Sequence, residues 1–178
     1  MAPRRQYKTR TFRIPQEYDD VLQEEAEKRS ISANNLVEQI LRKFSQNDRY
    51  YDLTQILSIA PTTMTSILEM LSDVEVTKAG KKAGSVRAKD NLLMRGMDLD
   101  YASVKWFIEE IMANDAGWFI CTYRRRDGVN TFYIRHNLGH KWNIFIGAYL
   151  DAMIETILNV EAIFDTQNGS MLLKIPLD

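Results

Sequence analysis

The side chains best suited to metal or haem chemistry are two histidines and one cysteine. His136 and His140 are the only histidines and lie four residues apart, and Cys121 is the only cysteine. Imidazole nitrogen and thiolate sulfur bind zinc, and a histidine can ligate haem iron. The spacing crosses a loop that contains Gly139, and no second cysteine or carboxylate completes a known ligand pattern. We therefore expect no metal and no cofactor, with a haem- or metal-dependent sensor as an alternative.

Catalytic patterns are weaker still. The sequence has no glycine-rich phosphate loop and no serine in a nucleophile elbow, and its carboxylates are scattered. Cys121 lies in an aromatic segment and is expected to be a small buried residue. We therefore expect no enzyme. Six side chains are candidates for an apolar pocket that takes a small-molecule effector, although core packing explains the aromatic ones equally well: Trp106, Trp118, Tyr123, Tyr133, His136 and Trp142.

A different chemistry is indicated near the N-terminus, where residues 7–15 form a β-prone run. In a strand, Phe12 and Ile14 share one face, while Thr9, Thr11 and Arg13 share the other. Arginine makes bidentate contacts with guanine, and threonine hydrogen-bonds a base edge or packs on the thymine methyl group. Such a row suits contacts with DNA bases; the alternative is the solvated face of an edge strand.

The charge distribution supports this interpretation. The net charge is only -1, but it conceals a local asymmetry. Residues 1–13 carry basic residues and no acid: Arg4, Arg5, Lys8, Arg10 and Arg13. Residues 14–27 carry acids and no base. A basic patch on one face is what nucleic-acid binding requires, so the neutral total does not exclude it.

Two amphipathic helices are predicted after this run. In residues 16–29 the apolar side chains recur at spacings of three and four, and a second stripe starts after Ser32, which can cap the next helix. Two helices and one strand bury too little apolar surface to be stable alone. A single strand also leaves both edges unpaired. Two copies that pair their strands solve both problems, so we expect a homodimer.

This segment resembles the ribbon-helix-helix family of DNA-binding proteins, of the Arc/MetJ type, whose β-ribbon enters the major groove. The resemblance covers residues 1–46 and rests on a few positions at family spacing: Phe12-Arg13-Ile14-Pro15, Leu22, Ala26, Ile31-Ser32 and Leu36-Val37. One departure is Ser30, where the family often has glycine.

The resemblance implies a role for each matching position on double-stranded DNA. The base-contacting positions are Thr9, Thr11 and Arg13. The phosphate-contacting start of the second helix falls on Ser32, Ala33 and Asn34. Apart from the resemblance, the positive charges of Arg4, Arg5, Lys8 and Arg10 are expected to contact phosphates through nonspecific, salt-sensitive attraction. The expected dimer core consists of Phe12, Ile14, Leu22, Leu36, Val37 and Ile40.

Residues 47–52 lose the apolar period and are expected to be a linker to a second domain at 53–178. Its predicted elements are strands at 53–60, 118–125, 131–136, 160–165 and 171–175, and helices at 62–71, 101–112 and 141–158. Lysine-rich residues 78–89 suit a helix, a loop or a second phosphate patch, with a solvated surface favoured. The predicted fold class is α+β, an antiparallel sheet with helices packed on one face.

Residues 135–142 make the second domain weakly similar to sensor domains of the vinyl-reductase-like and haem-nitric-oxide-binding-like groups, and no ligand residues are carried over from them. With one cysteine, no secretory signal and no apolar run of about 20 residues, we expect a cytoplasmic protein without a membrane segment. The expected function is a sequence-specific transcriptional regulator such as a repressor. If two dimers pair through the second domains, they would bind adjacent half-sites on the DNA. The alternative is an antitoxin-like module that dimerises and neutralises a partner protein.

Overall fold

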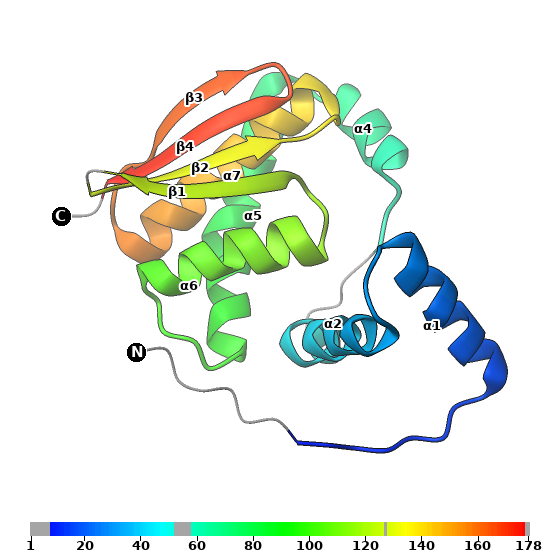
Figure 1. The fold of residues 1–178 in the computed structure, drawn as a ribbon. Coiled ribbons are helices and arrows are strands. Elements are labelled where there is room, and N and C mark those ends of the chain that lie inside the picture. The colour runs from blue at the N-terminus through cyan, green and yellow to red at the C-terminus, as the bar shows by residue number, and fades with distance from the viewer. Residues whose placement is uncertain (1–7, 52–57, 127, 177–178) are drawn as a thin grey trace. The chain divides into compact units, whose positions relative to one another are not determined.

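The computed structural model describes residues 8–51, 58–126 and 128–176. The chain is mixed α+β with one antiparallel sheet, which confirms that part of the predicted fold class, whereas the predicted N-terminal ribbon-helix-helix module is not shown. The chain divides into two compact units. We call Met1–Arg49 the N-terminal unit and Tyr50–Asp178 the C-terminal unit (Figure 1). None of the helices in the described ranges is long and apolar enough to cross a bilayer.

From residue 8 onward, the N-terminal unit contains two α-helices joined by a tight turn. Helix α1 spans Gln16–Lys28 and α2 spans Ala33–Gln46; a short 3-10 helix, η1, follows at Asp48–Tyr50. The turn closes with N–H donation from Ser30 to the Glu27 carbonyl (2.9 Å) and from Ile31 to the Ala26 carbonyl (3.0 Å). This is a Schellman motif, which requires a left-handed residue and therefore favours glycine. Ser30 adopts that conformation with φ of 54°.

Within residues 58–176, apart from residue 127, the α-helices are α4 (Pro61–Glu69), α5 (Asp73–Met94), α6 (Tyr101–Trp106) and α7 (Gly139–Leu158). A π-helical segment, η2 (Phe107–Asp115), continues α6. The basic residues 78–89 thus lie within α5. The strand predicted at 53–60 falls mostly outside the described residues, and Ser58–Ala60 are not in a strand. They lead directly into α4, whose first turn is set by Pro61.

Four strands form one antiparallel sheet in the order β1-β2-β4-β3. They span Ile120–Arg126 (β1), Val129–Arg135 (β2), Ile163–Gln167 (β3) and Ser170–Pro176 (β4). Both hairpins lie where the sequence predicts them. Alternate residues of β2 and β4 are fully buried, Phe132, Ile134, Leu173 and Ile175 among them. These face α6 and α7, which lie on the same side of the sheet (Figure 1).

Helix α7 packs along α5 with the two backbones almost in contact. A Cβ atom built on Gly84 would lie 2.1 Å from the Tyr149 carbonyl oxygen, and one built on Gly80 would lie 2.6 Å from the Phe145 carbonyl oxygen. Only glycine fits at either position, since any side chain would push the helices apart. The C-terminal unit therefore has a helix pair fixed against one face of a sheet, with a core of its own.

Candidate nucleic-acid interface

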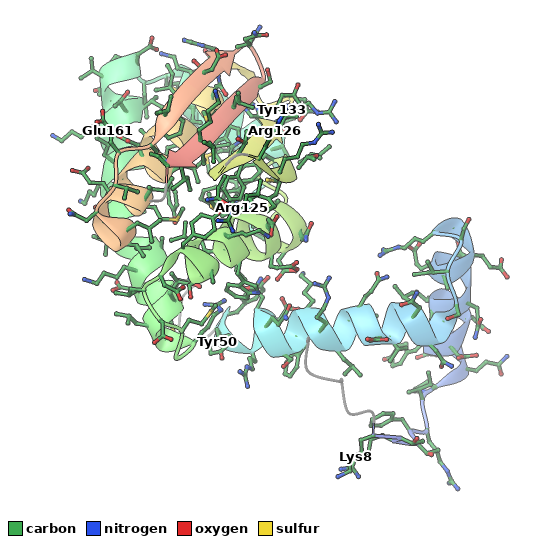
Figure 2. All side chains as sticks on the ribbon, turned by 60° about the vertical axis from the view of Figure 1, so that its left-hand side comes forward. Lys8, Tyr50, Arg125, Arg126, Tyr133 and Glu161 are labelled. Carbon is green, nitrogen blue, oxygen red and sulfur yellow. The ribbon has the colours of Figure 1, made fainter. Side chains whose placement is uncertain are left out.

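The segment Lys8–Pro15, expected to form the strand of a β-ribbon, is neither helix nor strand in the single chain. Every one of these side chains is exposed, and Figure 2 shows that of Lys8. The reason is physical, because a β-strand is stabilised by hydrogen bonds to a neighbouring strand, and a single copy of this unit offers none among its described residues. The ribbon itself is therefore not seen.

The predicted DNA-contacting side chains of this segment all reach solvent. They are the base-contacting Thr9, Thr11 and Arg13 and the phosphate-contacting Lys8 and Arg10. Arg4 and Arg5 lie outside the described residues. Within the described ranges, no carboxylate pairs with the three cations at positions 8, 10 and 13. Their charge is thus available to a polyanion.

The acidic helix α1 compensates part of its charge internally. The Lys28 ammonium lies 2.7 Å from the Glu24 carboxylate and 3.0 Å from that of Glu25, and Arg29 lies 3.5 Å from Glu25. The hydrogen bond from Lys28 lowers the pKa of Glu25 below its ordinary value. These acids are therefore occupied by cations of their own helix.

The first turn of α2 has free backbone donors. The Ser32 hydroxyl accepts the Asn35 N–H at 3.2 Å and caps the helix. The N–H groups of Ala33 and Asn34, the first two residues of α2, have no carbonyl one turn earlier to bond. No acidic residue lies in this turn. The predicted phosphate-contacting residues are thus brought together in a geometry that suits an anion.

Apolar side chains are unusually exposed in the N-terminal unit. Among its described residues, only Ala26 and Leu36 are buried apolar side chains. Of the expected dimer core, Leu36 is buried and Leu22 and Val37 are half-buried. The remainder are exposed in the single chain: Phe12 by 69%, Ile40 by 50% and Ile14 by 47%. Tyr18, Val21, Leu41 and Phe44 are exposed as well. Exposed apolar area of this extent in so small a unit is typical of interaction surfaces.

The histidines of the C-terminal unit have separate environments. Both ring nitrogens of His136 are engaged: Nε2 lies 3.1 Å from the Asn143 amide oxygen, and Nδ1 accepts the Leu138 N–H at 3.3 Å. Burial lowers the pKa of His136, which favours this neutral form. His140 is exposed, 3.8 Å from an Asp73 carboxylate oxygen. Over the ranges that the structure describes, no three histidine, cysteine or carboxylate side chains are placed to hold a metal ion. Through its contact with Asn143, His136 connects the end of β2 to α7.

The six side chains proposed as a ligand pocket do not line one cavity. Trp142 is buried against Trp118, with ring centroids 5.5 Å apart and its indole N–H donating to the Trp118 carbonyl at 3.1 Å. The ring of Tyr123 contacts that of Phe132 on the face of the sheet that points to the core. Trp106 is half-buried beside the core. Tyr133 lies on the opposite face of the sheet, because side chains alternate along β2. The prediction that all six side chains line one pocket is therefore wrong.

The structure contains a groove that the sequence interpretation missed. It has a volume of about 880 Å³ and lies between α5 and α7, with Lys78, Lys81 and Lys82 on one wall and Glu155 on the other. Asp151 lies 3.8 Å from Lys81. The sequence feature that could have predicted this groove is the spacing of Lys78, Lys81 and Lys82, three and four residues apart on one helix. The groove is open and of mixed charge, so it identifies no ligand class.

Comparison with models of protein families, with curated proteins and with solved structures found no match to this chain. A functional proposal therefore rests on the residues themselves. In the described parts of the chain, the strongest concentration of interaction features is the N-terminal unit, with its basic extended segment, its open helix N-terminus and its exposed apolar surface.

Proposed function

We propose that this protein is a homodimeric, sequence-specific DNA-binding regulator. Residues 8–15 of two chains pair as an antiparallel β-ribbon, as in ribbon-helix-helix proteins, and this ribbon enters the major groove of double-stranded DNA. The observation that carries the proposal is the exposed apolar surface of the N-terminal unit, next to a segment whose cations have no acidic partner among the described residues.

Burial of exposed apolar side chains would drive dimerisation. Phe12 and Ile40, 69% and 50% exposed in one chain, would be covered by the helices of the second copy. Full burial of such a side chain contributes about 1.5–3 kcal/mol. Pairing of the two extended segments also satisfies their backbone N–H and carbonyl groups. One contact surface thus provides both the ribbon and the core.

DNA recognition follows from the alternation of side chains along the ribbon. When Phe12 and Ile14 face the helices, Thr9, Thr11 and Arg13 of both chains face outward. A bidentate arginine–guanine contact discriminates by about 1–3 kcal/mol. The two α2 N-termini bind flanking phosphates through the Ala33 and Asn34 N–H groups. Phosphate contacts set the register, and base contacts give the specificity.

The C-terminal unit supplies regulation or further assembly in this proposal. It has a core of its own, whereas the partner-binding tail of an antitoxin-like protein usually lacks one and folds on its partner. The core therefore favours the regulator over that alternative. The proposed mode of action is occlusion of a promoter in the cytoplasm as a repressor, with paired dimers on adjacent half-sites.

Selection of bound sequences from a random DNA pool tests the proposal. A two-fold symmetric dimer should enrich a sequence with two related half-sites. Recovery of no preferred sequence at any salt concentration, from protein shown to be dimeric by sedimentation, would contradict it.

A further inference from the structure

The C-terminal unit has a sheet face that the described residues do not cover. Because paired residues of neighbouring strands point to the same side, the backbone register defines this face. We call it the outer sheet face: it consists of alternate residues of each strand, starting from Ile120 in β1, Val129 in β2, Ser170 in β4 and Ile163 in β3. Ile120 and Ile163 are 66% and 56% exposed. The helices of the unit pack on the other face (Figure 1).

The outer sheet face is strongly basic. Its cations are Arg124, Arg126, Arg135 and Lys174, and its only carboxylate is that of Asp165. Among the described residues, no ion pair involves Arg124, Arg135 or Lys174. These cations come from three adjacent strands, so they form a patch and not a single row. Such a patch is complementary to a polyanion.

An aromatic ring lies within this patch. Tyr133 is 44% exposed and is paired with Thr122 on one side and Leu172 on the other. The Arg135 guanidinium carbon lies 5.8 Å from the centre of its ring. Figure 2 shows Tyr133 on this sheet together with Arg126. An exposed ring beside one guanidinium group, with further cations on the same sheet face, suits an unpaired base that stacks while its phosphates are neutralised.

We propose that the outer sheet face binds a single-stranded nucleic acid, with a base stacked on Tyr133 and phosphates at Arg124, Lys174 and Arg135. Duplex DNA fits less well, because its bases are stacked on one another and offer no face to Tyr133. A second copy of this face fits less well too, because a two-fold contact would set the cations of one patch against those of the other. The proposal does not depend on DNA binding by the N-terminal unit.

Fluorescence anisotropy of the whole chain of 178 residues tests this inference. The probes are labelled oligouridylate and oligothymidylate of about 16 nucleotides, the upper range of sites on small single-strand-binding folds, and a duplex of equal length. Tyr133→Leu should weaken single-strand binding by about 5- to 150-fold, the effect of losing one stacked base. Tyr133→Phe keeps the ring and should bind like the parent. Removal of Arg124 and Lys174 together should lower the slope of log affinity against log salt by about 1.4, at roughly 0.7 for each phosphate contact.

Arg87→Ala, on the exposed surface of α5, is the control for net charge and should change little. Preference for the ribose or the deoxyribose probe identifies the natural ligand, and either one supports the inference. Three results would overturn it: single-strand affinity unchanged in Tyr133→Leu, loss of that affinity in Arg13→Ala instead, or binding confined to the duplex or to phosphatidylserine vesicles. Thermal melting of each variant shows that the exposed substitutions leave the fold intact.

Discussion

Replacement of Gly84 by alanine tests the contact between α5 and α7 on which the C-terminal unit depends. The new Cβ atom would lie 2.1 Å from the Tyr149 carbonyl oxygen, 2.9 Å from its carbonyl carbon and 3.0 Å from its Cα. All three are backbone atoms of a buried helix, so none can rotate aside. The helices must therefore separate, which opens the packing of the core on both sides of α7.

The magnitude follows from two opposing effects. Overpacking of a well-packed interior costs about 1–3 kcal/mol, and a backbone obstacle places Gly84→Ala at the upper end. Alanine gains about 1 kcal/mol in helix propensity over glycine. The expected net loss is about 2 kcal/mol in the free energy of unfolding. At about 4 °C per kcal/mol for a unit of this size, the melting temperature should fall by about 8 °C.

Urea denaturation and thermal melting measure this loss, and Gly147→Ala is the matched control. Its Cβ atom would lie 3.1 Å from the terminal methyl carbon of Met171, the end of a flexible side chain. The same gain in helix propensity then meets a neighbour that can move, so this variant should melt near the parent temperature. If Gly84→Ala were as stable as Gly147→Ala, the close approach of α5 and α7 would be refuted.

Three further predictions concern the turn, the dimer and the pH dependence. Ser30→Gly should stabilise the protein by about 0.5–1 kcal/mol in urea denaturation, because glycine adopts the left-handed conformation without strain; a decrease in stability would contradict the Schellman turn. Ile40→Glu should shift the protein from dimer to monomer in sedimentation, whereas Val86→Glu, at a 53% exposed position of α5, should not. Because burial lowers the pKa of His136 below 6.5, protonation favours the unfolded state, so stability should be complete above pH 6.5 and decline as pH falls below it. His136→Gln should remove that decline and His140→Gln should keep it; equal pH profiles for the two variants would exclude His136 as the cause.

The fold of the C-terminal unit could largely be predicted from local signals. Asp127-Gly128 and Asn168-Gly169 marked the two hairpins, and a stripe of large apolar side chains marked α7. Helix α5 could not be identified with the same certainty, because its buried stripe is built of small residues. Val76, Gly80, Gly84, Ala88 and Leu92 recur every four residues, but glycine and alanine give little hydrophobic contrast. Their role is visible only once α7 lies against them.

The differences between the predicted and the observed candidate sites have equally specific causes. Strand formation by residues 8–15 depends on a partner strand, which one chain does not supply. The six-residue pocket was inferred from composition, although the alternation in β2 already sets Tyr133 apart from Phe132 and Ile134. The same alternation, read along all four strands, would have identified the outer sheet face. Its unequal charge is visible only when the register is known.

The central claim, that the exposed face of a two-chain ribbon reads DNA sequence, is tested most directly by Arg13→Ala on the selected DNA site. Two arginines per dimer, at about 1–3 kcal/mol each, should cost at least 30-fold in affinity for that site while random DNA is bound almost as before and the dimer persists. Lys8→Ala removes a phosphate-binding cation, so it should instead weaken both DNAs alike and reduce the salt slope by about 1 for each phosphate that is no longer neutralised. Unchanged affinity of Arg13→Ala for both the selected and the random DNA would contradict the account.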